Sequence, residues 1–137
     1  LGAYDNAYTS NERTAYLFSA TENFYESLEY LLDFVTHPYF TEQTVQKEQG
    51  IIGQEIKMYE DEPSWPGYFG LIGCLYKDHP VKYDIAGTVE DITPITVDTL
   101  MSCYKTFYDY QNMVLCISGD VDENQILCYY KDIVTKM

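Results

Sequence analysis

Two glutamates, Glu48 and Glu55, lie seven positions apart in the stretch EQGIIGQEIKMYEDEP, residues 48–63. In a helix their carboxylates would project in nearly the same direction, about 20° apart after two turns. Ile52 and Ile56 would form an apolar stripe beside them. A carboxylate at the edge of a core is costly unless a cation, a backbone amine or a metal ion compensates its charge. A solvated surface face is the ordinary interpretation of such a pair, and a metal-binding face is the alternative that the rest of the sequence must support.

Two glycines, Gly50 and Gly53, fall between these glutamates. Each costs a helix about 1 kcal/mol relative to alanine, so we expect another backbone to pack closely at these positions. Lys47 and Lys57 are the nearby cations, but the helical rotation directs them away from the glutamates. A neighbouring lysine is therefore not expected to compensate the two carboxylates.

The composition limits the class of protein. The chain has 137 residues, of which 46% are hydrophobic, and its net charge is −14. These values fit a globular chain of one domain. The negative charge argues against binding to nucleic acid or to an anionic membrane surface. No stretch approaches the ~20 apolar residues of a membrane span, so we expect no membrane association.

Four cysteines lie in apolar stretches and form no C-x-x-C pair. They are Cys74, Cys103, Cys116 and Cys128. We predict reduced thiols in or near the core of a cytoplasmic protein.

The hydrophobic periodicity predicts an α+β protein with helices layered on an antiparallel or mixed sheet. Asn23 with Glu26, and Asp122 with Gln125, have the spacing of capping boxes. The expected elements are a strand at 12–20, a helix at 24–36 ended by Pro38, a long helix capped by Thr41, a helix at 64–76, a helix capped by Thr96, a strand at 112–119 and a last helix after Asp122.

Two strands are too few for an independently stable sheet. We therefore expect the partner strands to lie beyond one or both ends, and residues 1–137 to form a single partial domain, truncated at its N-terminal side. Exposed strand edges can pair with other chains, so self-association of the isolated chain is also expected.

Several longer segments carry a family resemblance. They are NAYTSNERTAYLF, PYFTEQTVQKEQGIIGQEIKMYEDEPSW, HPVKYDIAGTVEDI and CYKTFYDYQNMVLCISGDVD. Together they cover essentially the whole chain, which resembles the pitrilysin family of zinc peptidases, including insulinase and the mitochondrial processing peptidases. The resemblance implies the later part of a two-layer α/β metallohydrolase domain. That domain would be the N-terminal half of a longer chain, whose second, homologous domain is an expected partner.

The resemblance also implies roles for particular residues. In the family, a His-x-x-Glu-His motif supplies two zinc ligands and the general base, and the second glutamate of an E-x6-E pair supplies the third ligand. Glu55 would then be the zinc ligand, and Glu48 would orient the site without binding the metal. Asn6 and Ala7 match an edge strand that pairs with a peptide substrate. A turn before a strand is the alternative for Asn6.

The chain lacks the histidine motif of that family. Its only histidines, His37 and His79, stand outside any His-x-x-Glu-His sequence, and we expect both to be structural or surface residues. The parent would be a zinc metalloendopeptidase that cleaves extended peptides, whereas the isolated chain is predicted to hold no zinc and to be inactive. The alternatives are a non-catalytic homologue that acts as a scaffold or partner-binding domain, and an unrelated acidic interaction module.

Overall fold

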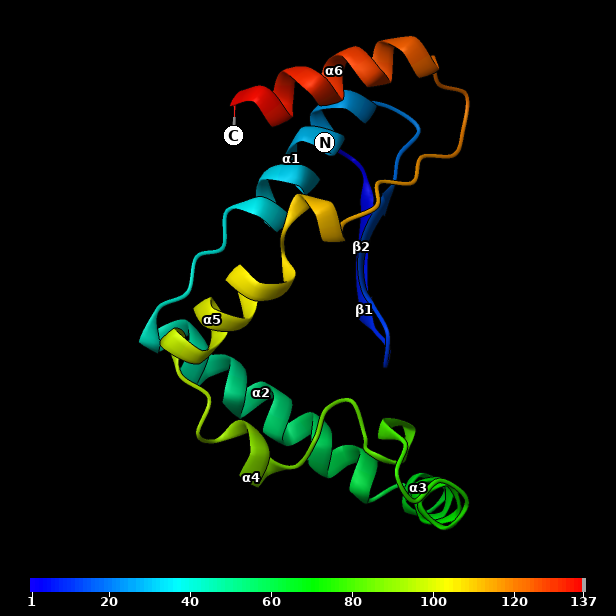
Figure 1. Cartoon of the computed structure of the whole chain (residues 1–137), viewed down its shortest axis with the longest axis vertical. Helices are drawn as coiled ribbons and strands as arrows, with labels where there is room; N and C mark the ends of the chain where they lie inside the picture. Colours follow the sequence, from blue (N-terminus) through cyan, green and yellow to red (C-terminus); the bar gives the residue numbers. More distant parts are fainter. Residues whose placement is uncertain (137) are drawn as a thin grey trace.

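The computed structural model describes the backbone of residues 1–136 and the side chains of residues 1–131. It has the predicted α+β class, with helices against an antiparallel hairpin (Figure 1). The elements are β1 (Tyr4–Thr9), β2 (Thr14–Ser19), α1 (Phe24–Thr36), α2 (Glu42–Glu60), α3 (Ser64–Leu75), the 3-10 turn η1 (Pro80–Lys82), α4 (Val89–Ile92), α5 (Val97–Phe107), the 3-10 turn η2 (Tyr110–Asn112) and α6 (Glu123–Lys136).

The hairpin is the whole of the sheet among the described residues. Strand β1 pairs antiparallel with β2, from Tyr4 opposite Ser19 to Thr9 opposite Thr14. Strand β2 confirms the strand predicted at 12–20, and α1 packs against it through ring contacts such as Phe18 with Phe24, whose centroids lie 5.8 Å apart. Every residue of β1 is exposed. The hairpin therefore has one packed strand and one open strand.

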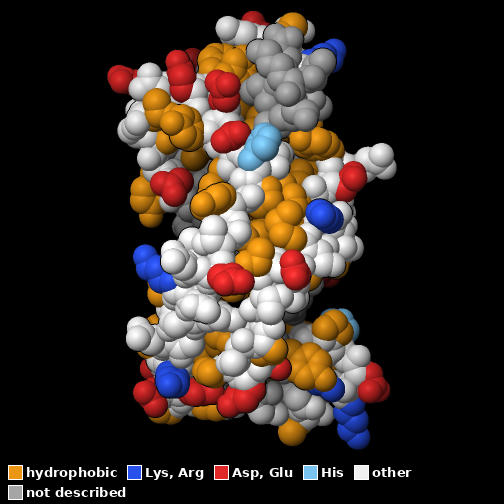
Figure 2. Space-filling model, turned by 90° about the vertical axis from the view of Figure 1, so that its left-hand side faces the viewer, with side chains coloured by type: hydrophobic (Ala, Val, Ile, Leu, Met, Phe, Trp, Pro, Cys, Tyr) orange, Lys and Arg blue, Asp and Glu red, His pale blue; other side chains and the backbone are white. Residues whose placement is uncertain are grey.

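The core is small and divided between the two ends of the molecule. Figure 1 shows α1 and α6 at one end, α2, α3 and α4 at the other, and α5 and the hairpin between them. Among the described residues, Leu28 of α1 is the most deeply buried apolar side chain, with 1% exposure, and Val45 and Ile56 of α2 and Ile92 of α4 are also buried. Figure 2 shows apolar side chains scattered among acidic ones on one face. The described residues thus leave much apolar surface uncovered.

Three of the predicted helix caps are confirmed. The hydroxyls of Thr41 and Thr96 accept hydrogen bonds from the backbone N–H groups of Thr44 and Thr99, which would otherwise be unpaired in the first turn. The carboxylate of Asp122 accepts the backbone N–H of Gln125.

The capping box predicted for Asn23 was wrong. Asn23 occupies the N-cap position of α1 in a left-handed conformation (φ 54°), but its side chain forms no cap hydrogen bond, and its amide donates to the carbonyl of Leu1.

The strand predicted at 112–119 is absent, although the described backbone there is extended at Met113 (φ −112°, ψ 150°). The run has strand composition, but it pairs with no described strand, and Val114 is 93% exposed. A strand requires a hydrogen-bonded neighbour as well as an apolar sequence. Residues 113–118 instead form one wall of a groove of about 1100 Å³, whose other walls come from β2 and α1.

The expectation of core cysteines was also wrong. The four thiols carry no disulfide, as predicted, but all four residues are exposed. Apolar neighbours in the sequence do not bury a residue when the surrounding elements leave that face open.

A tyrosine cluster joins the hairpin to two helices. The hydroxyls of Tyr16 on β2 and Tyr108 at the end of α5 are 2.7 Å apart, and the rings of Tyr104 and Tyr108 stack at 4.7 Å. Tyr104 donates to the carbonyl of Val35 in α1. Partial burial, and then the hydrogen bond with Tyr108, raise the pKa of Tyr16 well above its ordinary value.

This cluster predicts a loss of stability at alkaline pH. Because the folded state disfavours ionised Tyr16, its contribution is fully present below about pH 10, where tyrosine ionises in an unfolded chain, and is lost as the pH rises further. Tyr16→Phe should lower the free energy of unfolding at pH 7 by about 1 kcal/mol and flatten its decline above pH ~10. Urea unfolding followed by Trp65 fluorescence measures both effects.

The matched control is Tyr39→Phe, since Tyr39 is 82% exposed. It should leave the free energy of unfolding and its alkaline decline unchanged. Equal slopes above pH ~10 in the wild-type chain and Tyr16→Phe would contradict the prediction.

Candidate metal-ligand helix

Helix α2 is the element that positions the two glutamates. It begins after Thr41, which forms a reciprocal capping box with Thr44, and it runs for 19 residues to Glu60. Glu48 and Glu55 therefore lie within one uninterrupted helix, as their spacing predicted. Together with Ile51 and Met58 they occupy one side of α2, and we call these four residues the glutamate face.

The glutamate face is open. Both glutamates are exposed, Ile51 is 48% exposed and Met58 is 60% exposed. Neither carboxylate has a hydrogen bond or an ion pair with any described residue. The expected apolar stripe is present: Val45 and Ile56 are buried and Ile52 and Tyr59 are half-buried. The two glutamates lie beside this stripe, on the open side of the helix.

The buried side of α2 packs on α4 and on the segment that follows it. Val45, Gln49 and Ile56 share this side, which lies about 100° around the helix axis from the glutamate face. Ile92 at the end of α4 is buried against it, and a Cβ placed on Gly53 would lie 4.0 Å from Ile92 Cδ1. The rotation of α2 in this packing decides where the glutamates point.

Gln49 makes the polar contacts of this packed side. Its amide nitrogen donates to the carbonyls of Ile92 at 2.8 Å, Thr93 at 3.2 Å and Ile95 at 2.9 Å. The role of Gln49 could not be predicted from the sequence, because a single glutamine in a helix gives no local signal and its partners lie 43–46 positions further along the chain.

The expectation of close backbone packing at the helix glycines was wrong. A Cβ on Gly50 would have no atom within 4 Å, and the nearest atom to one on Gly53 belongs to a side chain. Gly53 does allow Ile92 to lie against the helix. The described residues give no physical reason for Gly50.

A second set of contacts holds the other end of α2. The ring of Tyr59 stacks on Trp65 at 4.7 Å, and the indole N–H of Trp65 donates to Asp84 Oδ2 at 2.6 Å. The other oxygen of Asp84 accepts the backbone N–H of Ala86. These contacts attach the loop of residues 84–88 to the junction of α2 and α3.

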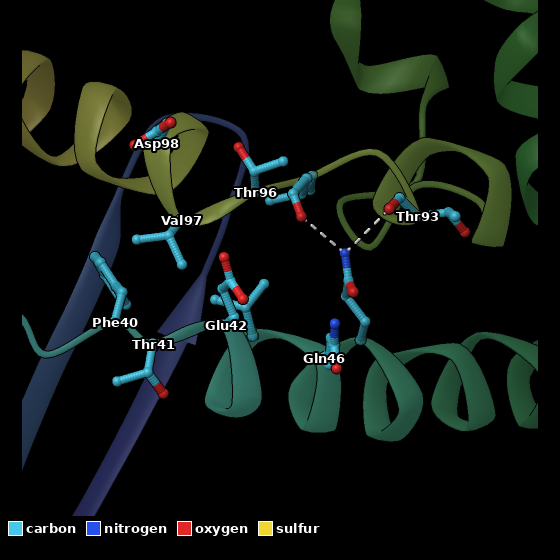
Figure 3. Close-up of a pocket in the computed structure, with 11 residues that line it drawn as sticks. Phe40, Thr41, Glu42, Gln46, Thr93, Thr96, Val97 and Asp98 are labelled. Atoms are coloured by element: carbon cyan, nitrogen blue, oxygen red, sulfur yellow. Dashed lines mark hydrogen bonds between the residues drawn. The ribbon is translucent and has the colours of Figure 1, made fainter.

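A pocket of about 780 Å³ lies beside the first turns of α2 and α5 (Figure 3). Its walls include the capping residues Thr41 and Thr96 and the acidic residues Glu42 and Asp98, and the hydrogen bonds from the Gln49 amide form one boundary. Neither Glu48 nor Glu55 lines it. The pocket is therefore separate from the glutamate face.

Asn6 and Ala7 lie on β1, as the resemblance implied, and not in a turn. They stand opposite Leu17 and Tyr16 of β2. The side-chain oxygen of Asn6 accepts the backbone N–H of Ala7 at 2.8 Å, whereas the Asn6 amide nitrogen donates to no described residue. Strand β1 has no neighbour on its other side among the described residues, so Asn6 stands on an edge strand with a donor available.

Both histidines lie on the surface, as expected. His37 Nδ1 is 3.0 Å from Asp33 Oδ1 at the end of α1, and His79 Nδ1 accepts the N–H of Val81 at the start of η1. Within the described residues, no group of three or more histidine, cysteine, aspartate or glutamate side chains could hold a metal ion. An exposed, unpaired glutamate such as Glu55 fits one position of a zinc site, and the other ligands would have to come from elsewhere.

The sequence matches two family models. Residues 1–88 match the model described as Insulinase (Peptidase family M16), and residues 94–135 match the model described as Peptidase M16 inactive domain. No helix among the described residues is long and apolar enough to cross a membrane.

Individual relatives agree with these matches. The zinc protease YmfH of Bacillus subtilis is 58% identical over 131 residues, which are 96% of this chain and 31% of YmfH. The mitochondrial-processing peptidase subunit beta of Caenorhabditis elegans is 29% identical over 128 residues, 93% of this chain and 28% of its own length. A crystal structure described as an M16-like peptidase from Alicyclobacillus acidocaldarius superposes with a TM-score of 0.94 at 43% identity, over 99% of this chain and 32% of that one.

The hairpin and the order of the helices are thus those of part of an M16-like peptidase structure. The chain belongs to peptidase family M16, the insulinase family. It spans about a third of the length of the relatives it matches.

Proposed function

We propose that this chain forms the part of an M16 zinc endopeptidase that supplies the third zinc ligand and the strand on which the substrate pairs. The single observation that supports this most is the glutamate face. Its two carboxylates are exposed, unpaired within the described residues and held on one side of a continuous helix. YmfH, the Bacillus subtilis relative reported above, is named a zinc protease.

In this proposal Glu55 binds the metal, and Glu48, two turns earlier on the same side, orients the site through hydrogen bonds. Carboxylate oxygen is an ordinary zinc ligand, and a neighbouring carboxylate commonly fixes the ligand geometry. Zinc supplies Lewis-acid activation of a water for attack on a peptide carbonyl. The two histidine ligands and the general base would come from outside these residues, so the chain alone would be inactive.

Strand β1 would receive the substrate by strand addition. An extended peptide can add its backbone to an open sheet edge, which gives affinity without strict sequence preference. The free amide donor of Asn6 would hydrogen-bond a substrate carbonyl. A second, homologous domain of the longer protein would close the site from the other side.

A second candidate is a non-catalytic homologue that serves as a scaffold. The match of residues 94–135 to the model described as an inactive domain favours it. The open glutamate pair argues for the peptidase, because a scaffold has no physical requirement for two aligned carboxylates.

The ligand role of Glu55 predicts zinc binding in a complete peptidase. We define the YmfH chimaera as B. subtilis YmfH in which this chain replaces the 131 matching residues. The chimaera should hold about one zinc per chain, and Glu55→Gln should lose it because the ligand charge and basicity are removed. Elemental analysis after dialysis measures the zinc content. The isolated chain should hold none.

The matched control is Glu60→Gln, an equal charge change at an exposed position of the same helix. It should retain the metal. Full zinc content in Glu55→Gln would show that the ligand assignment is wrong. A chimaera without zinc would favour the scaffold candidate.

Glu48→Gln should weaken zinc binding less than Glu55→Gln does. Loss of a carboxylate that only orients a metal site lowers affinity about 10–100-fold. Competition with a chromogenic chelator in the chimaera measures this difference. If the two variants bind zinc equally weakly, Glu48 is a ligand as well.

The strand-addition role predicts a substrate-binding defect in Asn6→Ala. Loss of one hydrogen bond of about 1 kcal/mol should lower kcat/KM for an extended fluorogenic peptide by roughly fivefold. Zinc content should not change. Asp5→Ala is the control, because successive side chains of a strand point to opposite faces. An unchanged kcat/KM in Asn6→Ala would remove Asn6 from the substrate site.

A further inference from the structure

We propose that Gln49 is the positioning residue of the metal-ligand helix: it fixes the rotation of α2 so that Glu55 faces the metal site. This inference rests on the proposed function of Glu55. It assigns to Gln49 a role that depends on contacts to a different segment of the chain, and not on contact with the metal or the substrate.

Three backbone carbonyls converge on the side-chain amide nitrogen of Gln49. The carbonyls of Ile92, Thr93 and Ile95 all lie 2.8–3.2 Å from the Gln49 amide nitrogen. An amide NH2 has two protons, so at least one proton is shared between two carbonyls. The last carbonyls of a helix have no partner within it. The Ile92 carbonyl also accepts the backbone N–H of Ile95, so Gln49 is its second donor.

The hydrogen bonds of Gln49 are directional, unlike the apolar contacts of α2. The buried side chains on this side of α2, Val45 and Ile56, are apolar, and Ile92 of α4 lies beside Gly53. Apolar contacts are non-directional and allow a helix to turn or slide by small amounts. Hydrogen bonds weaken steeply with distance and angle. Gln49 therefore supplies the restraint on rotation that the apolar contacts lack.

Gln49 lies on the same helix as the two glutamates and close to them in the sequence. It lies one residue after Glu48 and six before Glu55, about 100° around the axis from the first and about 120° from the second. The glutamates themselves have no contact that orients them within the described residues. Since a metal site tolerates displacements of only about 0.5 Å, a small rotation of α2 is sufficient to misplace Glu55.

The test uses the YmfH chimaera with Gln49→Met, which keeps the side-chain length and removes the donor, and Gln49→Asn, which keeps the amide but shortens its reach. The control is Gln46→Met on an exposed position of the same helix. Each protein is titrated with zinc against a chelator, and the cobalt-loaded form is examined by visible absorption, which reports the ligand geometry. Urea unfolding without metal measures stability separately.

We expect Gln49→Met to lower zinc affinity about 10-fold, as other changes outside the ligand set do, and to alter the cobalt spectrum. Gln49→Asn should show a smaller change in the same direction, and Gln46→Met none. A loss of stability with zinc affinity and cobalt spectrum unchanged would overturn the proposal. If Gln49→Met does not fold, Gln49→Asn decides: an unchanged affinity and spectrum overturns the proposal.

The outcomes separate the two proposals. If Glu55→Gln loses zinc while both Gln49 variants bind normally, only the positioning role fails. If Glu55→Gln keeps zinc in the same chimaera, the ligand assignment fails, and the role of Gln49 fails with it.

Discussion

Helix α2 buries one side against α4, and the candidate site depends on which side that is. Val45 and Ile56 are buried because they are apolar residues that recur at helical spacing, and Ile92 of α4 lies beside Gly53. This contact leaves the glutamate face pointing outward. If α2 were turned by about 100°, the carboxylates would be buried against α4 without compensation, at a cost of several kcal/mol. Apolar packing and the cost of burying charge therefore select the same orientation.

In the hairpin, β1 pairs with a neighbour on one side only. The backbone groups of its other edge therefore have no strand partner among the described residues. Strand β1 is exposed along its whole length, and residues 113–118 line the same groove as β2 without pairing to any described strand. An open strand edge can pair with other chains. In the proposed peptidase this edge would receive a peptide substrate as the added strand. The arrangement of β1 is thus suited to a backbone partner, and Asn6 adds a side-chain donor to that edge.

Much of the fold could be predicted because its signals are local. Thr41 and Thr96 cap helices through residues three positions away, and the E-x6-E spacing requires only that α2 be one helix. The failures involve distant partners. A strand at 112–119 needs a neighbour that sequence periodicity cannot supply. The predicted burial of the cysteines needed neighbouring elements to cover them. Gln49 was missed for the same reason, since its role exists only once the end of α4 lies against α2.

A metal site assembled from distant segments must meet an entropic condition. Each ligand that moves freely before binding loses that freedom when the metal arrives, and the loss is subtracted from the affinity. In the proposed site, helix α2 would reduce this loss for Glu55, because its backbone is held at one end by the Thr41 cap and at the other by the stacking of Tyr59 on Trp65. The three carbonyls that meet Gln49 would restrain rotation of α2 about its axis, so the backbone of Glu55 would be in place before the other proposed ligands bind.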